Sequence, residues 1–490
     1  MPVPICDRWS MDAFPSRNPA RPDDVVGEYP IHGPAEVDAA VARAADAQVA
    51  WARRPIPARA DVVAAAGAVI AREKERFTTL VSREAGKVLV EAGGDVQEAV
   101  DMAAFVAGQG RGPWGDTVPS ELGDKLCWTT RQPVGVVGMI TPWNFPIAIP
   151  SWKIFPALLA GNGVVIKPSE HAPACTEAFV GACVEAGVPE GLIQVVHGFA
   201  EPAAALASHR GVRAVSFTGS VATGRAVGSA AMASGPRLVS LELGGKNAMV
   251  VRPDADLDLV TDGAIFGAFG TAGQRCTSTS RLVVHPDVAG ELVARIVARA
   301  EALRLGDPQD PATDVGPVIT ANSAQRIVRL VAAGGAEGAE VATGGRVVEV
   351  DGLGGAFVTP TVLTGVKPEH HIACDEVFGP VLSVIEVDGL EEALDVVNSV
   401  EYGLSAAVYT RDINAALHAV DRIDTGIVYV NAPTIGAEIP LPFGGTKHTG
   451  NGFREAGTRG IEQFSELKTV YVDYSGRLQR AQIDTERGTS

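Results

Sequence analysis

The chain has 490 residues, of which 46% are hydrophobic and 20% are charged, a balance typical of globular proteins. This length exceeds what one hydrophobic core usually sustains, so we expect two or three domains. A formal net charge of −17 without a basic stripe argues against a nucleic-acid partner, and the lack of a run of about 18 apolar residues argues against a membrane span.

Residues 35–110 are predicted to be helical, because alanine-rich runs there carry charges at helical spacing. Gly86 is predicted to end one of these helices. From residue 135 to residue 245, short strands rich in β-branched residues alternate with helices. This alternation is typical of a parallel sheet, which binds ligands at the carboxyl ends of its strands.

A second alternation of strands and helices begins near residue 245 and predicts a second α/β domain. Its helices are expected at 288–304, 321–333, 389–400 and 413–423. Two extended segments, "KLCWTTRQPVGV" (125–136) and "KTVYVDYS" (468–475), stand apart from both alternations. We expect them to pair with each other or with another subunit and so to form an oligomerisation arm, followed by a frayed polar tail at 484–490.

The cysteines and the N-terminus indicate the compartment. Six cysteines are scattered along the chain with no C-x-x-C pair, which argues against a disulfide framework and against a zinc or other metal site. The first ten residues lack a basic region followed by an apolar stretch, so we expect no secretory signal. A cytoplasmic location fits both observations best.

Two segments of the first alternation could hold an anionic cofactor, although no G-x-G-x-x-G fingerprint follows the first strand. In "FTGSVATG" (217–224), Gly219 makes a turn and Ser220 opens a helix, whose N-terminus favours a pyrophosphate. In "VIKPSE" (165–170), Lys167 can donate to a ribose hydroxyl or a phosphate, and Glu170 can accept from ribose hydroxyls, which favours NAD over NADP. The alternatives are an ordinary helix cap and a surface ion pair.

Three polar residues in unusual settings are candidates for catalysis. Cys276 follows a strong cation in "GQRCT", and a reactive thiolate needs such a polar or cationic setting. Glu242 interrupts an apolar strand in "LELGGKN", where burial would raise its pKa toward that of a general base. The Asn144 amide in "PWNFP" could donate to an oxyanion. A core cysteine, a paired structural glutamate and a turn asparagine are the alternatives.

Six motifs in order resemble those of the NAD(P)-dependent aldehyde dehydrogenase superfamily over almost the whole chain. They are "TPWNFP", "FTGS", "LELGGKN", "GQRCT", "EVFGP" (376–380) and "PFGG" (442–445). The resemblance implies an α/β chain that forms dimers or tetramers. Its parts would be a Rossmann-like cofactor domain (1–121 and 137–241), an α/β catalytic domain (242–447), and a small β oligomerisation arm with the C-terminal tail (122–136 and 448–490).

The resemblance also implies a role for each matched residue. Cys276 would attack the aldehyde, Asn144 and the Cys276 backbone N–H would stabilise the oxyanion, and Glu242 would activate the water that hydrolyses the thioester. Glu455 matches a carboxylate of a proton relay, although an extra residue precedes the pair Arg454-Glu455. NAD, or else NADP, would bind at Ile140, Trp143, Lys167, Glu170, Gly219, Ser220, Gly244, Glu376 and Phe378.

Arg275 bears on the choice of aldehyde, because a guanidinium would bind a carboxylate or phosphate at the far end of a substrate. The loop "TIGAEIPLPFGG" (434–445) also resembles the carboxylate-binding loop of aminoadipate semialdehyde enzymes, so we expect a carboxylated semialdehyde. Alternatively, Arg275 turns away and holds a neighbouring loop. The residues that match substrate-binding positions are Phe145, Ile149, Trp152, Arg275, Thr277, Gly436, Ala437 and Phe443.

Other functions would leave different traces in the sequence. A coenzyme A-acylating relative would use the same thiol but generally lacks the glutamate of "LELGG", so Glu242 argues against it. A catalytically silent structural relative need not retain Cys276, Glu242 and Asn144 together. A cysteine hydrolase needs a histidine near the thiol, and only His285 is close in sequence, with no hydrolase signature around it.

Overall fold

The computed structural model describes residues 13–235 and 237–483, so residue 236, the first twelve residues and the predicted polar tail at 484–490 lie outside it. The described chain begins with an antiparallel hairpin of β1 (Ala13–Asn18) and β2 (Arg21–Pro30), which the sequence analysis did not predict. Four helices follow, as predicted for residues 35–110: α1 (Pro34–Arg53), α2 (Ile56–Arg72), α3 (Lys74–Ala85) and α4 (Leu89–Gln109). Gly86 ends α3 in a left-handed conformation, with φ of +72°.

The first α/β unit is built on a five-stranded parallel sheet, as its alternating pattern predicted. The order is β7 (Ile193–Val195), β6 (Gly163–Pro168), β5 (Val136–Thr141), β8 (Val212–Thr218) and β9 (Leu238–Glu242). Its helices are α5 (Ala148–Ala160), α6 (Pro173–Glu185), α7 (Ala200–Ser208) and α8 (Val221–Ala233). Because the chain leaves β5 toward β6 on one side and later toward β8 on the other, a crevice opens between the ends of β5 and β8.

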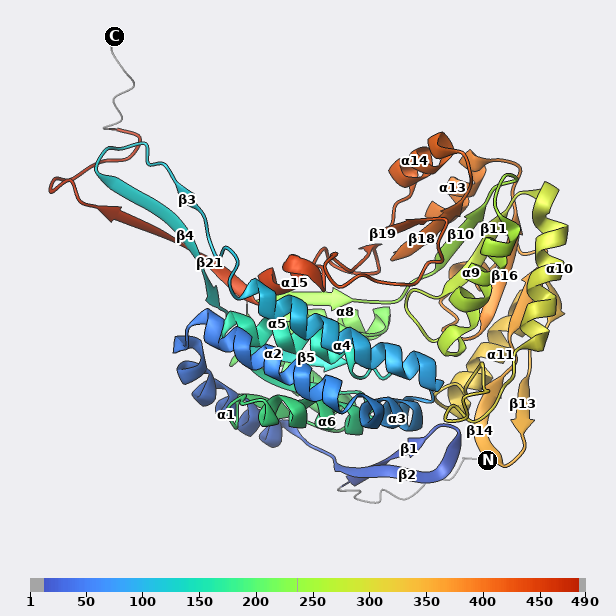
Figure 1. Ribbon diagram of the computed structural model, residues 1–490, viewed down its shortest axis with the longest axis horizontal. Helices are drawn as coiled ribbons and strands as arrows, with labels where there is room; N and C mark the ends of the chain where they lie inside the picture. Colours follow the sequence, from blue (N-terminus) through green and yellow to red (C-terminus); the bar gives the residue numbers. More distant parts are fainter. Residues whose placement is uncertain (1–12, 236, 484–490) are drawn as a thin grey trace, which may run out of the picture.

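Hydrophobic layers cover both faces of this sheet. Val137 and Met139 of β5 pack into a cluster with α2, α4 and α5, whereas Val136 and Ile140 pack into another with α1, α7 and α8. This alternation follows from the two-residue period of a strand. Figure 1 shows α2 and α4 lying across the sheet on one side.

The second α/β unit is built on a seven-stranded sheet. Its order is β12 (Glu340–Thr343), β15 (Thr361–Thr364), β16 (Val381–Glu386), β11 (Thr279–Val284), β10 (Asn247–Val251), β18 (Ser405–Tyr409) and β19 (Ile427–Val430), and only β12 is antiparallel. The predicted helices are confirmed as α10 (Pro286–Ala302), α11 (Ala321–Ala336), α13 (Leu390–Asn398) and α14 (Ile413–Arg422).

Shorter elements complete this unit. They are α9 (Leu257–Phe269), a 3-10 turn (Gly270–Gly273), α12 (His371–Cys374), the hairpin of β13 (Val347–Val350) and β14 (Leu353–Val358), and the pair β17 (Tyr402–Gly403) and β20 (Thr446–Lys447). Figure 1 shows the second unit beside the first, with β10, β11 and β16 near its centre.

A third sheet projects away from both units, at the upper left of Figure 1. It consists of β3 (Thr117–Val118), β4 (Lys125–Pro133) and β21 (Ser465–Asp473), and β21 pairs with β4 over its whole length, from Ser465 opposite Pro133 to Asp473 opposite Lys125. The expectation that these two extended segments pair is confirmed. Residues 448–464, which the sequence analysis grouped with the arm and tail, lie instead against the body, because Gly450 bridges to Glu242 and α15 (Gly457–Glu462) packs on α5.

Within the described ranges no helix is long and apolar enough to cross a membrane.

Candidate active site

Two cavities meet at Cys276. The first is lined by all eight residues that the sequence analysis assigned to the substrate, together with Cys276, Glu242 and Glu455. The second is lined by the turns that follow β5 and β8 and by the loop that carries Glu376 and Phe378. Ile149, Thr218, Leu243 and Cys276 line both cavities. A molecule in the first cavity and one in the second would therefore meet beside the Cys276 thiol.

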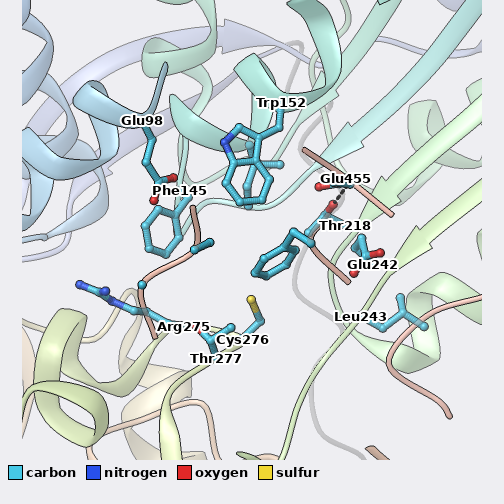
Figure 2. A pocket seen from close by; sticks show the side chains of 14 residues that line it. Glu98, Phe145, Trp152, Thr218, Glu242, Leu243, Arg275, Cys276, Thr277 and Glu455 are labelled. Carbon is cyan, nitrogen blue, oxygen red and sulfur yellow. Dashed lines mark hydrogen bonds between the residues drawn. The ribbon is translucent and has the colours of Figure 1, made fainter. Parts of the chain in front are cut away.

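Cys276 is placed by the loop that joins α9 to β11. Its carbonyl accepts a hydrogen bond of 2.8 Å from Asn247 Nδ2, which ties the loop to the start of β10. Figure 2 shows its sulfur pointing into the first cavity, on the side of Glu242. Burial, followed by the carboxylates of Glu376, Glu242 and Glu455, raises the pKa of the Cys276 thiol to about 12. The thiol is thus protonated at neutral pH until a base removes its proton.

Glu242 ends β9 and is only 2% exposed. Neither of its carboxylate oxygens has a hydrogen-bond partner among the described residues. Burial, and secondly the neighbouring Glu455, raises the pKa of Glu242 well above its usual value, as the sequence predicted for a carboxyl group at the end of a buried strand. An unpartnered carboxylate beside a cavity that also holds a thiol is suited to accept a proton.

Asn144 lies in the second cavity, in the turn after β5, and is 4% exposed. Its amide donates a hydrogen bond of 3.0 Å to the carbonyl of Gln274, two residues before Cys276. Because an amide group has two N–H donors, this bond anchors the side chain next to the nucleophile and leaves a second donor.

Glu455 reaches the first cavity from the segment between β20 and α15. It is 1% exposed and forms an ion pair with the buried Lys153 of α5. Lys153 also donates a hydrogen bond of 2.7 Å to Ser216. The extra residue before Arg454 therefore does not keep this carboxyl group out of the site.

The second cavity has the features of a dinucleotide site. Ser220 caps α8 and accepts a hydrogen bond from Thr223 N, so the predicted helix start is confirmed, with its free N–H groups facing the crevice between β5 and β8. The aromatic rings of Trp143 and Phe378 meet edge to face, 5.7 Å apart. The Glu376 carboxylate accepts from Gly245 N at 3.1 Å, and a Cβ on Gly244 would collide with it.

The remaining predicted cofactor residues lie at the neighbouring strand end. Ile140 of β5 pairs with Lys167 of β6. Lys167 Nζ is 3.4 Å from Glu170 Oε2, so the two side chains form an ion pair, but Lys167 is only 5% exposed and the pair is not the surface pair given as the alternative. Glu170 lines a further cavity, next to Pro15 and Ile319. Glu170 does not line the second cavity itself.

Arg275 lines the first cavity, but its guanidinium is held by a partner. Arg275 Nη2 is 3.1 Å from Glu91 Oε1, and its Nε donates to Thr271 Oγ1 at 2.9 Å. Figure 2 shows this side chain leading away from the Cys276 sulfur. Arg275 precedes Cys276 in the sequence, but its guanidinium does not face the thiol in space. It therefore does not lower the pKa of the Cys276 thiol, which agrees with the raised pKa of that thiol.

Several lining residues escaped the sequence analysis. In the first cavity these include Glu98 of α4, whose pKa is raised to about 7 mainly by burial and then by Asp95. Its spacing from Glu91 and Asp95 places three acidic residues on one face of a helix, a pattern that could have indicated it. The other lining residues that the sequence analysis did not assign are Pro142, Thr218 and Leu243, which lie inside recognised motifs, and Ser323 and Arg326 of α11.

The fold and this site define a class of enzyme with a cysteine nucleophile between a substrate cavity and a dinucleotide crevice. Residues 7–470 match the model of the aldehyde dehydrogenase family, and the chain belongs to that family. It is an NAD(P)-dependent enzyme that oxidises an aldehyde to the carboxylic acid.

Two relatives and one solved structure illustrate the similarity. The chain is 37% identical to alpha-ketoglutaric semialdehyde dehydrogenase of Bacillus subtilis, over 94% of this chain and 95% of that protein. It is 40% identical to alpha-ketoglutarate semialdehyde dehydrogenase of Haloferax volcanii, over 93% and 95%. The crystal structure of betaine aldehyde dehydrogenase from Staphylococcus aureus in complex with NAD+ matches with a TM-score of 0.92 at 31% identity, over 95% of this chain and 93% of that chain.

Proposed function

We propose that the chain oxidises a carboxylated semialdehyde with NAD, and that Arg275 receives the carboxylate at the far end of the substrate. The observation that carries this proposal is that Arg275 and Cys276 line the same cavity. The relatives from Bacillus subtilis and Haloferax volcanii are named for alpha-ketoglutaric semialdehyde, which also carries a carboxylate. The sequence motifs had suggested the aminoadipate semialdehyde branch. The feature common to both branches is a semialdehyde that carries a carboxylate, and the proposal is limited to that class.

The walls of the cavity suit a short chain between the two ends of such a substrate. The rings of Trp152 and Phe443 meet edge to face at 5.1 Å, and Phe145 lies next to Arg275. A guanidinium binds a carboxylate through two parallel hydrogen bonds. Nη2 of Arg275 already donates to Glu91. The substrate carboxylate would therefore accept from the remaining N–H groups of the guanidinium or compete with Glu91 for Nη2.

The residues of the chain divide the reaction between them. Glu242 removes the thiol proton, and Cys276 Sγ forms a bond to the aldehyde carbon while Asn144 and the Cys276 N–H donate to the new oxyanion. Bound NAD supplies the acceptor for the two electrons and the hydrogen that leave this carbon. Glu242 must first release the thiol proton, which Glu455 and Lys153 would relay away. Glu242 then takes a proton from the attacking water, the carbon–sulfur bond breaks to return the Cys276 thiolate, and the acid leaves.

The residues of the second cavity fit NAD. The start of α8 at Ser220 would hold the pyrophosphate, and Glu376 would accept from the hydroxyls of the nicotinamide ribose. Phe378 would lie against the nicotinamide ring, with Gly219 and Gly244 leaving room for it. Lys167 and Glu170, with Ile140 beside them, would face the adenosine ribose, where a carboxylate disfavours the extra phosphate of NADP.

The experiment is a comparison of aldehydes with the variant Arg275→Met, which keeps the length of the side chain. We expect kcat/KM for alpha-ketoglutaric semialdehyde, relative to hexanal, to fall about 10- to 100-fold, the equivalent of a charged hydrogen bond of about 1.5–3 kcal/mol. Taking the ratio of the two aldehydes cancels any effect on the thiol. An unchanged ratio would contradict the role of Arg275, and a lack of NADH formation with any aldehyde would contradict the proposed function itself.

We also propose that the chain forms a homodimer or homotetramer through the arm of β3, β4 and β21. Leu126, Leu467 and Tyr471 of this arm are 53%, 60% and 64% exposed, an apolar surface that a partner would cover. Sedimentation velocity of the variant Leu467→Asp/Tyr471→Asp tests this, with a smaller species expected and an unchanged mass counting against it. A reducing compartment such as the cytoplasm would keep the Cys276 thiol free.

A further inference from the structure

The backbone just before Cys276 adopts a left-handed turn. Thr271 has φ of 53° and ψ of 32°, Ala272 has φ of 51° and ψ of 35°, and Gly273 follows with φ of 68°. Left-handed backbone is unfavourable for any residue with a Cβ, and two such residues in succession are rare. A turn of this kind persists only where its surroundings hold it.

Glu91 of α4 holds this turn from outside. Its two carboxylate oxygens accept from the backbone N–H of Thr271 at 2.8 and 2.9 Å. One of them also accepts from Arg275 Nη2 at 3.1 Å, and Arg275 Nε donates to Thr271 Oγ1 at 2.9 Å. The carboxylate thus joins the start of the turn to the residue that precedes Cys276. With 9% of the Glu91 side chain exposed, water competes little for these bonds.

This contact connects the two α/β units. Glu91 lies on α4, whose buried face packs with Val137 and Met139 of the five-stranded sheet. Ala272 packs in the core of the seven-stranded sheet, with Val250 and Ile327. The Asn144 amide makes a second link of the same kind, to the Gln274 carbonyl. The segment that leads into the nucleophile is therefore held from the unit that carries the cofactor crevice.

The turn has little freedom on its other side. A Cβ on Gly273 would overlap the Gly379 carbonyl, so the backbone there is already in close contact with the loop of Phe378. Ile319 N donates to Gln274 Oε1 at 2.9 Å. If the Glu91 contact is lost, the backbone should therefore change conformation at Thr271 and Ala272, where the left-handed conformation is least favourable. That change would displace Cys276, which follows in the same segment.

We propose that Glu91 is a positioning residue for the nucleophile: by holding the left-handed turn at Thr271 and Ala272, it fixes the direction of the Cys276 thiol between the two cavities. It touches neither reacting atoms nor the thiol, and it acts through the backbone of the turn and through Arg275. This role is independent of which aldehyde the enzyme oxidises.

The test measures the thiol without any substrate. In cofactor-free protein, the rate at which iodoacetamide alkylates Cys276 is followed by mass spectrometry, with the half-buried Cys374 as an internal reference thiol. In Glu91→Ala we expect kcat for hexanal to fall by up to about 100-fold, as for a displaced catalytic group. The rate at which Cys276 is alkylated should change by up to the same factor. The KM for NAD and the alkylation of Cys374 should stay as in the wild type. Asp101→Asn, an exposed change on the same helix, is the matched control and should behave as the wild type.

A second substitution separates positioning from general damage. Glycine adopts the left-handed conformation without the penalty of a Cβ, so Ala272→Gly should restore about 10-fold of what Glu91→Ala loses in kcat. If Glu91→Ala does not fold, Glu91→Gln replaces it, since its amide keeps an acceptor for Thr271 N–H but loses the charge that holds Arg275. A folded Glu91→Gln or Glu91→Ala with wild-type kcat and alkylation would overturn the proposal, and so would a failure of Ala272→Gly to restore activity.

Discussion

Glu242→Gln provides the most direct test of the division of labour at this site. Both oxygens of the Glu242 carboxylate are buried without a hydrogen-bond partner in the described part of the chain, so an amide of the same shape leaves the surrounding contacts intact. The amide cannot accept a proton. Loss of a general base costs about two to four powers of ten in rate, so kcat should fall by about 100- to 10,000-fold.

Glu455 also lines the cavity, but its carboxylate is held in an ion pair by the buried Lys153 and is not free to replace Glu242. The decline in kcat should therefore approach the full effect of removing a base. Glu455→Gln, which leaves Glu242 in place, is the matched control and should lower kcat much less.

The assay is stopped-flow NADH formation followed to steady state. Glu242→Gln should slow the steady state, while the thiol still reacts once at high pH, where it ionises without a base. The wild type should also lose activity as pH falls, because Glu242 works only when ionised and its pKa is raised by burial and by Glu455. That acidic limb should be absent from Glu242→Gln. A fall in kcat of less than about 10-fold, or an unchanged acidic limb, would refute this role for Glu242.

The other predictions concern the charged groups around the cavity. Burial raises the pKa of Glu98 to about 7, so Glu98 becomes negatively charged as pH rises through 7. The kcat/KM for an anionic semialdehyde relative to hexanal should therefore decrease over that pH range. Glu98→Gln should remove this pH dependence, and an identical pH profile in the variant and the wild type would contradict the prediction. Lys87→Met leaves the buried Asp95 charge unpaired and should lower the free energy of unfolding by about 3–5 kcal/mol in denaturant titrations, with Lys87→Met/Asp95→Asn recovering part of it. With a thiol pKa of about 12, Cys276 in the cofactor-free protein should be alkylated about tenfold faster for each pH unit from 7 to 10, and a plateau below pH 9 would contradict this.

The sequence allowed the prediction of those parts of the fold that short-range patterns determine. The helices at 35–110 and the alternations that follow have the periodicity of their elements, and the carboxyl ends of the parallel strands bring Glu242, Ser220 and Asn144 to one edge of the five-stranded sheet. The hairpin of β1 and β2 was missed because its second strand is rich in proline and acidic residues and is mostly exposed, so it lacks the alternation that indicates a strand.

The direction of a side chain in an irregular loop could not be predicted in the same way. The sequence placed Arg275 next to Cys276 but could not show that Glu91, almost two hundred residues earlier, would hold its guanidinium. Glu98 was missed for a related reason, since a helix far from every recognised motif supplies it. The contact between Arg275 and Glu91 depends on how two separate α/β units pack together, and no local pattern records that.

The packing of the two units also accounts for the chemistry of the thiol. A single α/β unit could place Cys276 in a loop, but the surroundings that raise its pKa come from both units: Glu242 and Glu455 lie on the side of the five-stranded sheet, and Glu376 lies in the loop before β16. A thiol that stays protonated without cofactor is slow to react with oxidants and stray electrophiles.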